Sequence, residues 1–204
     1  MKKYRSDEID KLILILNNDG VISVPTDTVY GLCCKVNSEI SYERLVNLKN
    51  RPSNKSFPIM CSNINQIRNI ASVGDREEKL INNFMPGAVT LVLKKHVNVN
   101  NAGFRDTDEV AIRMAPSDVL YKIINEVGPV FMTSANKSGE DVCKNIEQIE
   151  KVFPDLDVRN PVWVILSSSP KFVPIDSPHK FIPGQNPYGI SLTSIVIKNN
   201  LCQL

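Results

Sequence analysis

Histidine, tryptophan and glycine-rich loops are scarce in this chain. It has two histidines and one tryptophan among 204 residues. Neither Gly-x-x-x-x-Gly-Lys-Ser/Thr nor Gly-x-Gly-x-x-Gly occurs, which excludes the two common glycine-rich phosphate cradles. Gly-x-Ser-x-Gly is also absent, and His96 and His179 lie in polar, Lys-rich or Pro-rich surroundings. These absences argue against a Ser-His-Asp or Cys-His catalytic arrangement and against a covalent nucleophile.

Cysteine occurs in odd number and without a metal-binding spacing. None of the five cysteines belongs to a Cys-x-x-Cys pair, and their spacing is irregular. Such a set is typical of reduced thiols in a reducing compartment rather than of a disulfide framework. Because histidine is also scarce, we predict that the protein itself supplies no metal site.

Long apolar runs are missing as well. Stretches such as Leu12–Leu16 and Val162–Leu166 are far shorter than the roughly 20 apolar residues that span a bilayer. The basic start of the chain turns acidic at Asp7 and Glu8, so no signal-peptide apolar region follows it. We therefore expect a cytoplasmic protein with no membrane span.

The net charge is small, but the cations are unevenly placed. Hydrophobic residues make up 42% and charged residues 23%, which favours a globular chain, and we expect a single domain over residues 1–204. A net charge of +2 is too small to indicate nucleic-acid binding by its long-range field. Residues 44–55 nevertheless carry four cations and no acid. If a nucleotide binds, Lys49, Arg51 and Lys55 are the natural phosphate ligands; the alternative is a solvated basic loop.

Apolar periodicity predicts short strands and helices in irregular alternation. Predicted strands are residues 21–25, 57–61, 89–94, 110–114, 130–134, 162–166, 172–175 and 193–196, with helices over 9–18, 41–48, 65–71, 75–84 and 118–127. Residues 98–108 are predicted as loop. Since clean strand–helix–strand units are missing, we expect an α+β or irregular α/β fold. Its sheet should be twisted, open and mixed parallel and antiparallel, with flanking helices.

Polar side chains follow three of the apolar segments. Residues 26–32 begin with Thr26-Asp27-Thr28 after a strand, the Lys49-Asn50-Arg51 loop follows a helix, and Thr133-Ser134-Ala135-Asn136 ends another strand. Strand ends that meet at one edge would gather hydroxyls and cations into one anion site. For the hydroxyl residues the alternative is ordinary turn and cap chemistry.

Arg113 stands alone as a charge in the apolar strand at 110–114. A buried charge is costly unless it is paired. Two explanations remain open at this point. One is a salt bridge to Asp108 or Glu109, and the other is a bidentate grip on a substrate carboxylate.

The motifs, in their order along the chain, resemble the YrdC/Sua5 family of threonylcarbamoyl-adenylate synthases over about residues 9–140. They are PTDTVYGL at 25–32, LKNRPSNKSFPIM at 48–60, MPGAVTLVL at 85–93, VAIRMAP at 110–116 and TSANKSG at 133–139. Five separated motifs in one order form a specific signal. The resemblance implies a YrdC-like twisted open sheet whose concave, positively charged face holds ATP beside threonine.

The resemblance also implies roles for individual residues. For L-threonine it implies Thr28, Arg113, the backbone of Met132, and Thr193. For ATP it implies Lys49, Arg51, Lys55, Thr133, Ser134 and Asn136. The residues implied in catalysis are Lys49, Arg51 and Arg113. Mg²⁺ would arrive with ATP, held mainly by phosphates and water, with no ligand from the protein.

The implied activity is L-threonylcarbamoyladenylate synthesis from L-threonine, bicarbonate or CO₂, and ATP, for tRNA threonylcarbamoyladenosine modification. This nucleotidyltransferase would pass its product to a downstream threonylcarbamoyl transferase complex. The alternative is a paralogue that binds double-stranded RNA or tRNA on its basic face without synthase activity. A carbamoyl transferase of hydrogenase maturation is disfavoured, because the acylphosphatase and zinc-finger modules of those members are missing here.

Three departures from the family pattern stand near the end of the chain and in the strand at 57–61. Ile197 occupies the place of an acid after Thr193-Ser194-Ile195-Val196, and no Arg-Pro-Gly follows before Leu204. Met60 stands where some members have histidine. We expect the short, single-domain form of the family.

Overall fold

The computed structural model describes residues 3–5, 8–26, 29–51, 56–99, 102–104, 107–115, 117–153, 162–166 and 195–198. The strands in these ranges are β1 (Lys3–Arg5), β2 (Val21–Pro25), β3 (Tyr30–Lys35), β4 (Ile59–Cys61), β5 (Val89–Lys94), β6 (Glu109–Met114), β7 (Val130–Ser134), β8 (Val162–Leu166) and β9 (Ile195–Lys198). The helices are α1 (Ile9–Asn17), α2 (Glu39–Lys49), α3 (Ile64–Ile70), α4 (Asp75–Phe84), α5 (Asp118–Val127) and α6 (Ile146–Val152), with a 3₁₀ turn η1 (Ala102–Phe104).

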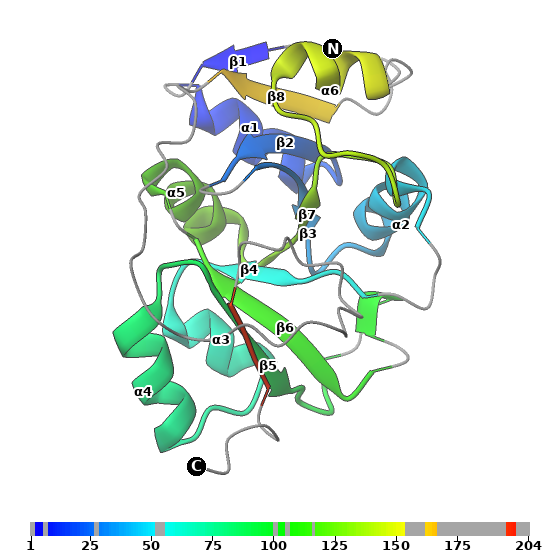
Figure 1. Ribbon diagram of the computed structural model, residues 1–204. Coiled ribbons are helices and arrows are strands. Elements are labelled where there is room, and N and C mark those ends of the chain that lie inside the picture. The colour runs from blue at the N-terminus through cyan, green and yellow to red at the C-terminus, as the bar shows by residue number, and fades with distance from the viewer. Residues whose placement is uncertain are drawn as a thin grey trace.

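The described strands form one mixed sheet in the order β1-β8-β2-β3-β7-β4-β6-β5-β9 (Figure 1). Pairing is parallel between β1 and β8, β8 and β2, β4 and β6, and β5 and β9. It is antiparallel in the other four pairs, β2–β3, β3–β7, β7–β4 and β6–β5. The predicted mixed, open sheet with flanking helices is thus confirmed.

Helices cover both faces of the sheet. Side chains of α2, α3, α4 and α6 pack with one face into a single apolar cluster, and those of α1 and α5 pack with the other. In β7, Phe131 belongs to the first cluster, while Val130 and Met132 belong to the second. This alternation is the period of two that a strand imposes. Burial on both sides explains why the central strands read as nearly continuous apolar runs.

Several predicted elements have the predicted bounds. They are β2, α4, β5, α5, β7 and β8. The main error concerns residues 26–32, for which the sequence predicts a polar segment at a surface. Tyr30–Lys35 is instead a strand, β3, that folds back on β2 and is buried along nearly its whole length. The polar residues that precede β3 in the sequence led to the prediction of a surface segment in place of a buried strand.

Two further differences lie toward the C-terminal end. Helix α6 was not predicted; it is capped by Asn145, whose side chain accepts from the Gln148 N–H. Strand β9 continues to Lys198, two residues past the predicted end at Val196, and residues 193 and 194 lie outside the described residues. The predicted strand at 172–175 lies outside the described residues.

An aromatic cluster fastens α2 and the segment after it to the sheet. The ring centroids of Tyr42 and Phe131 are 5.0 Å apart, those of Tyr42 and Phe57 5.7 Å, and those of Phe104 and Phe131 5.3 Å. Gly103 packs so closely that a Cβ there would lie 2.6 Å from Phe131 and 2.7 Å from Tyr42. The cluster therefore fixes the position of α2 relative to β7.

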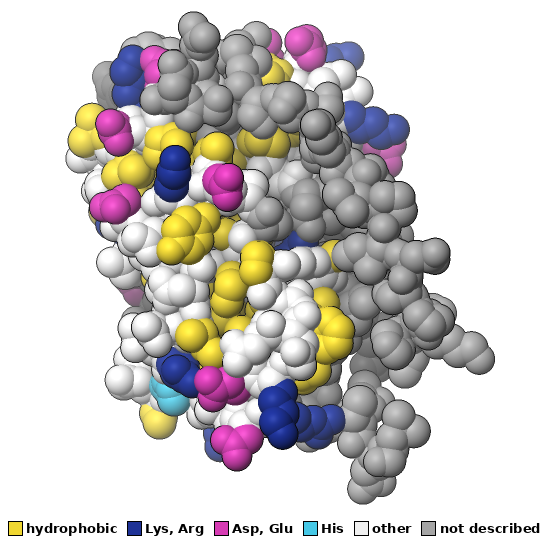
Figure 2. Space-filling model, turned by 90° about the vertical axis from the view of Figure 1, so that its left-hand side faces the viewer, with side chains coloured by type: hydrophobic (Ala, Val, Ile, Leu, Met, Phe, Trp, Pro, Cys, Tyr) yellow, Lys and Arg dark blue, Asp and Glu magenta, His cyan; other side chains and the backbone are white. Residues whose placement is uncertain are grey.

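The face of the molecule seen in Figure 2 carries both signs of charge. Apolar side chains lie among the charged ones, and neither sign dominates. Exposed large apolar side chains occur on the helices, as with Leu14 on α1, Phe84 on α4 and Tyr121 on α5. Within the described ranges, no helix has the length and apolarity to cross a bilayer.

Gly103→Ala should destabilise the fold. The new methyl group would overlap two rigid rings, and overpacking of this kind costs about 1–3 kcal/mol. Urea unfolding should show a lower midpoint with an unchanged slope. Val97→Ala, at a side chain that is 99% exposed, is the control and should leave the midpoint in place. Equal midpoints for the two variants would contradict the packing described for the aromatic cluster.

Candidate functional site

Lys49 is a buried cation at the end of α2. The helix is capped at its start by Ser38, whose side chain accepts from the Ser41 N–H, and at its end by Asn50 in the left-handed conformation with φ 48°. Lys49 is 2% exposed. Its Nζ donates to the backbone oxygen of Ser134 at 2.8 Å and to Asn136 Oδ1 at 2.7 Å. The end of α2 and the end of β7 are thereby joined through one ammonium group.

The loop after β7 holds these acceptors in place. Ser134 Oγ donates to Asn136 Oδ1 at 2.6 Å, and Asn136 Nδ2 donates to the Glu140 carbonyl at 2.7 Å. The amide of Asn136 thus has its oxygen turned toward Lys49. The Ser138 N–H closes the arrangement by donating to the Lys49 carbonyl at 2.7 Å. Both ends of Lys49, backbone and side chain, are held by the same loop.

The electrostatics of Lys49 favour an added negative charge. Burial, followed by the nearby Arg51 guanidinium, lowers the pKa of the Lys49 ammonium from 10.5 to about 7; Cys143 acts weakly in the opposite sense. Both acceptors of Lys49 are neutral oxygens. An anion placed here would therefore be attracted and would restore the charged form of the lysine.

Arg51 is held beside this cluster by its own contacts. Its guanidinium lies over the Phe57 ring at 4.7 Å, and Nη2 donates to the Ser56 carbonyl at 2.8 Å. Stacking on an aromatic face and a backbone hydrogen bond both restrict the guanidinium plane. Because Phe57 belongs to the aromatic cluster, the position of Arg51 depends on the packing of the core.

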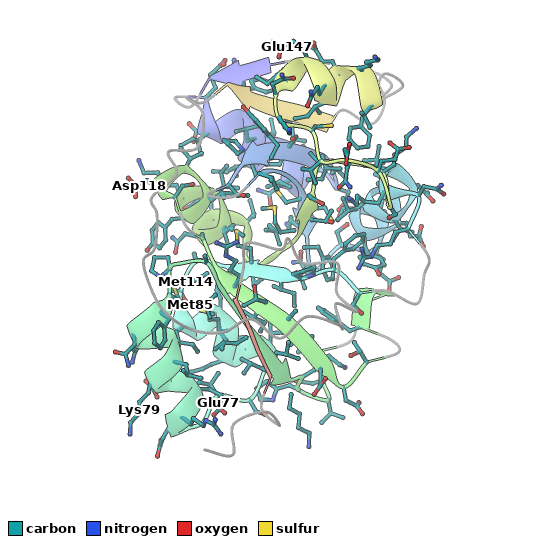
Figure 3. The ribbon with its side chains drawn as sticks, viewed as in Figure 1. Glu77, Lys79, Met85, Met114, Asp118 and Glu147 are labelled. Atoms are coloured by element: carbon teal, nitrogen blue, oxygen red, sulfur yellow. The ribbon has the colours of Figure 1, made fainter. Side chains whose placement is uncertain are left out.

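Arg113 lies in β6 and is 8% exposed. Its Nε donates to the Gly87 carbonyl at 2.9 Å, just beyond the end of α4. Figure 3 labels Met114 at the end of β6 and Met85 at the end of α4, and both pack in the same apolar cluster. The alternative of a salt bridge to Asp108 or Glu109 stays a prediction.

Arg113 and Ser134 share one face of the sheet. Arg113 pairs in register with Met60, which pairs with Val130. Met132 and Ser134 follow Val130 on the same face because side chains alternate. Arg113 and Ser134 are therefore roughly 15 Å apart, because β6 and β7 are separated by two strand spacings and Ser134 lies four residues further along β7 than Val130. Arg113 thus shares its sheet face with Ser134, whose hydroxyl meets the Lys49 cluster at Asn136 Oδ1, and Met132 lies between these two cationic points.

The remaining predicted residues fall into two groups. Thr133 projects to the opposite face from Ser134, since neighbouring strand residues alternate; its predicted contact with ATP stays a prediction. Thr26 closes a turn, with Oγ1 accepting from the Val29 N–H at 3.2 Å and donating to the Val29 carbonyl at 2.6 Å. This confirms turn chemistry for Thr26. The predicted sites Thr28, Lys55 and Thr193 lie outside the described residues.

Sequence reasoning missed the backbone groups that hold the site. The Gly87 carbonyl on Arg113 and the Glu140 carbonyl on Asn136 belong to residues to which no role was assigned. The Pro-Gly at 86–87 signalled only a turn. Which carbonyl reaches which side chain depends on how distant segments pack, and no local pattern records it. In the described part of the chain, no three His, Cys, Asp or Glu side chains gather to hold a metal ion.

Comparison with known sequences supplies the family. The model of Sua5_yciO_yrdC, described as "Telomere recombination", matches residues 14–178. This chain belongs to the Sua5/YciO/YrdC family. The "Threonylcarbamoyl-AMP synthase" of Vibrio vulnificus (strain YJ016) is 29% identical over 148 residues, covering 70% of this chain and 78% of that protein. The protein of the same name from Escherichia coli O1:K1 / APEC is 28% identical over 153 residues, covering 73% and 80%.

Solved structures of the family share the fold. P. abyssi Sua5 complexed with L-threonine has a TM-score of 0.71 and 25% identity, and the match covers 80% of this chain. It covers 49% of the Sua5 chain, so this Sua5/YciO/YrdC chain corresponds to about half of that protein. E. coli YciO has a TM-score of 0.69 with 21% identity and coverage of 82% of both chains, which supports the fold alone.

Lys49 should make stability depend on pH. In the folded chain the lysine releases its proton near pH 7, whereas the ordinary value for the unfolded chain is 10.5. Between these values the unfolded state binds more protons, so the free energy of unfolding rises with pH. Relative to Lys49→Met, wild-type stability should climb from pH 7 to 9 by at most about 1.4 kcal/mol per unit and stay flat below pH 6.

Urea unfolding at pH 6, 7.5 and 9 measures this difference. Lys79→Met is the control, because it makes the same substitution at an exposed lysine on α4. Its curve should run parallel to wild type throughout. A Lys49→Met curve that also runs parallel would contradict the depressed lysine pKa.

Proposed function

We propose that this chain is an L-threonylcarbamoyladenylate synthase, a nucleotidyltransferase that acts on ATP, L-threonine and bicarbonate or CO₂. The observation that carries the proposal is a pair of cationic points at the same sheet strands: Lys49 with Arg51 at the end of β7, and Arg113 on the face that Ser134 and Met132 share. The relatives that bear the name threonylcarbamoyl-AMP synthase support it, as does the Sua5 structure complexed with L-threonine.

At the first point we assign the triphosphate to Lys49 and Arg51. Phosphate oxygens are strong acceptors, and the two side chains offer a compact ammonium and a planar fork. Ser134 and Asn136 fix the ammonium direction and lie next to the nucleotide. Lys55, Thr133 and Thr193 keep the roles that the resemblance implies, Lys55 and Thr133 toward ATP and Thr193 toward threonine.

At the second point we assign the threonine carboxylate to Arg113. A guanidinium pairs with a carboxylate in two parallel hydrogen bonds, and the Gly87 carbonyl fixes its plane at Nε. With Nε turned to that carbonyl, the carboxylate would approach end-on, toward the Nη nitrogens. Thr28 and the backbone of Met132 complete the threonine site in the same scheme.

The proposed reaction needs no covalent protein intermediate. The amine of threonine adds to CO₂ with loss of a proton and forms a carbamate. A carbamate oxygen then attacks the α-phosphorus of ATP, the bond to the β-phosphate oxygen breaks, and pyrophosphate leaves with the electron pair. The contribution of the protein is to place two anions in line and to offset the charge that develops on the phosphates.

Magnesium enters the scheme as part of the ATP substrate. Bound to the phosphates, Mg²⁺ would neutralise part of their charge and polarise the phosphorus. The protein side of the site, Lys49 and Arg51, is cationic and suits phosphate oxygens rather than a metal ion. Everything else in the proposed mechanism rests on the residues of the chain.

Pyrophosphate release from ATP and bicarbonate tests the proposal. We expect release with L-threonine and little with serine or with no amino acid. If ATP binds but threonine causes no pyrophosphate release, the synthase proposal fails. That result would favour the alternative, a protein that binds double-stranded RNA or tRNA. That alternative has its own signature, because binding through several phosphates weakens steeply as salt increases.

Arg113→Ala should remove threonine binding and leave ATP binding nearly intact. Loss of a bidentate charged pair should weaken threonine by roughly 100-fold, whereas the change for ATP should stay below about threefold. Calorimetric titration of each substrate measures both. Arg68→Ala is the control, since Arg68 forms a half-exposed ion pair with Glu78 at 2.7 Å. Unchanged threonine affinity in Arg113→Ala would refute the carboxylate assignment.

A further inference from the structure

One hydrogen bond is missing from the ladder between β4 and β7. Ile59 pairs with Phe131 and Met60 with Val130, so the next pair along the antiparallel ladder is Pro58 with Met132. The Met132 N–H donates to the Pro58 carbonyl at 2.9 Å. A hydrogen-bonded antiparallel pair exchanges two such bonds. Proline has no N–H, so the return bond to the Met132 carbonyl cannot form.

The strand on the other side of β7 does not replace the missing donor. In an antiparallel strand the N–H and C=O of one residue point to the same side, and hydrogen-bonded pairs alternate with non-bonded ones. The Val36 N–H donates to Pro129, and the Ala135 N–H donates to Tyr30. That alternation makes Met132 and its β3 neighbour Cys33 a non-bonded pair. The Met132 carbonyl thus faces β4, where the donor is absent.

The location of this carbonyl matches the proposed substrates. Met132 lies on the strand between the rows that hold Arg113 and Ser134, and it is 7% exposed. A buried carbonyl that lacks its ladder donor is destabilising, because it has given up its hydrogen bonds to water. A carbonyl oxygen accepts over a broad range of directions, including from the face that carries Arg113. A substrate N–H placed between the two cationic points would satisfy it.

We infer that Pro58 is a positioning residue, which keeps the Met132 carbonyl available as the acceptor for the nitrogen of the amino-acid substrate. This inference rests on the proposed function and adds a residue to it. The amine of threonine donates to the carbonyl first, and the N–H that remains in the carbamate donates afterwards. The Met132 carbonyl thereby fixes the substrate nitrogen. Arg113 holds the carboxylate of the same substrate, and the new carbamate oxygen approaches the phosphorus.

Pro58→Ala tests the inference, because alanine restores an N–H at the gap. The new backbone amide at position 58 should bond to the Met132 carbonyl and be protected from hydrogen exchange. Competition for the carbonyl should raise the KM for threonine about tenfold, the size of one hydrogen bond to a charged group, with the KM for ATP unchanged. A purely structural role for the proline would change both constants or neither. Pro58→Ser carries the same N–H and serves if the alanine variant does not fold.

Pro129→Ala is the matched control. Pro129 occupies an equivalent place in the ladder between β7 and β3, where its carbonyl accepts from Val36. The substitution removes one proline and adds one strand N–H at the opposite end of β7, so both KM values should equal those of wild type. A tenfold threonine effect in this control would overturn the inference.

Three outcomes separate the inference from the proposed function. Protection of the new amide at position 58 together with a threonine-specific KM increase supports the inference. Protection without that increase, or no protection at all, overturns it while wild-type pyrophosphate release still stands. Absence of threonine-dependent release in the wild type overturns the proposed function itself, and the assignment of the Met132 carbonyl to the substrate nitrogen falls with it.

Discussion

The buried ammonium of Lys49 is the interaction on which the candidate site depends. It joins the end of α2 to the end of β7, and the backbone and side chains of residues 134–140 are arranged around it. Its acceptors are neutral and Arg51 is near, so the charged form is disfavoured, as the pKa of about 7 indicates. An anionic ligand removes this penalty, which is why the arrangement suits phosphate better than it suits the empty protein.

The sheet determines how the two cationic points relate. Strand alternation puts Arg113, Met132 and Ser134 on one face, and the register of β6, β4 and β7 sets their separation. The same geometry explains why backbone groups contribute: Gly87 orients Arg113 at one end, and Glu140 orients Asn136 at the other.

Much of the fold could be predicted from the sequence, and the site only in part. Helices α4 and α5 and strands β5 and β7 have strong periodicity and clear turn residues, and their bounds were predicted correctly. Strand β3 was missed because the polar residues Thr26-Asp27-Thr28 come just before it, so that the whole segment was assigned to the surface. Lys49 and Asn136 were predicted together from strand-end reasoning, and their hydrogen bond confirms the proximity. The carbonyls of Gly87 and Glu140 could not be predicted, because their partners follow from register and packing rather than local pattern.

Similarity of fold, such as the similarity to YciO, does not by itself assign a reaction. The functional assignment therefore depends on the polar groups of the site. Two anions that repel each other must be brought within bonding distance. Because Arg113 lies roughly 15 Å from Ser134, beside the Lys49 cluster, bound molecules must extend toward each other to meet. ATP and a carbamate of threonine have the length and the charges at the required ends. A donor between those ends needs an acceptor between the cations, and Met132 is the residue whose carbonyl the ladder leaves in that position.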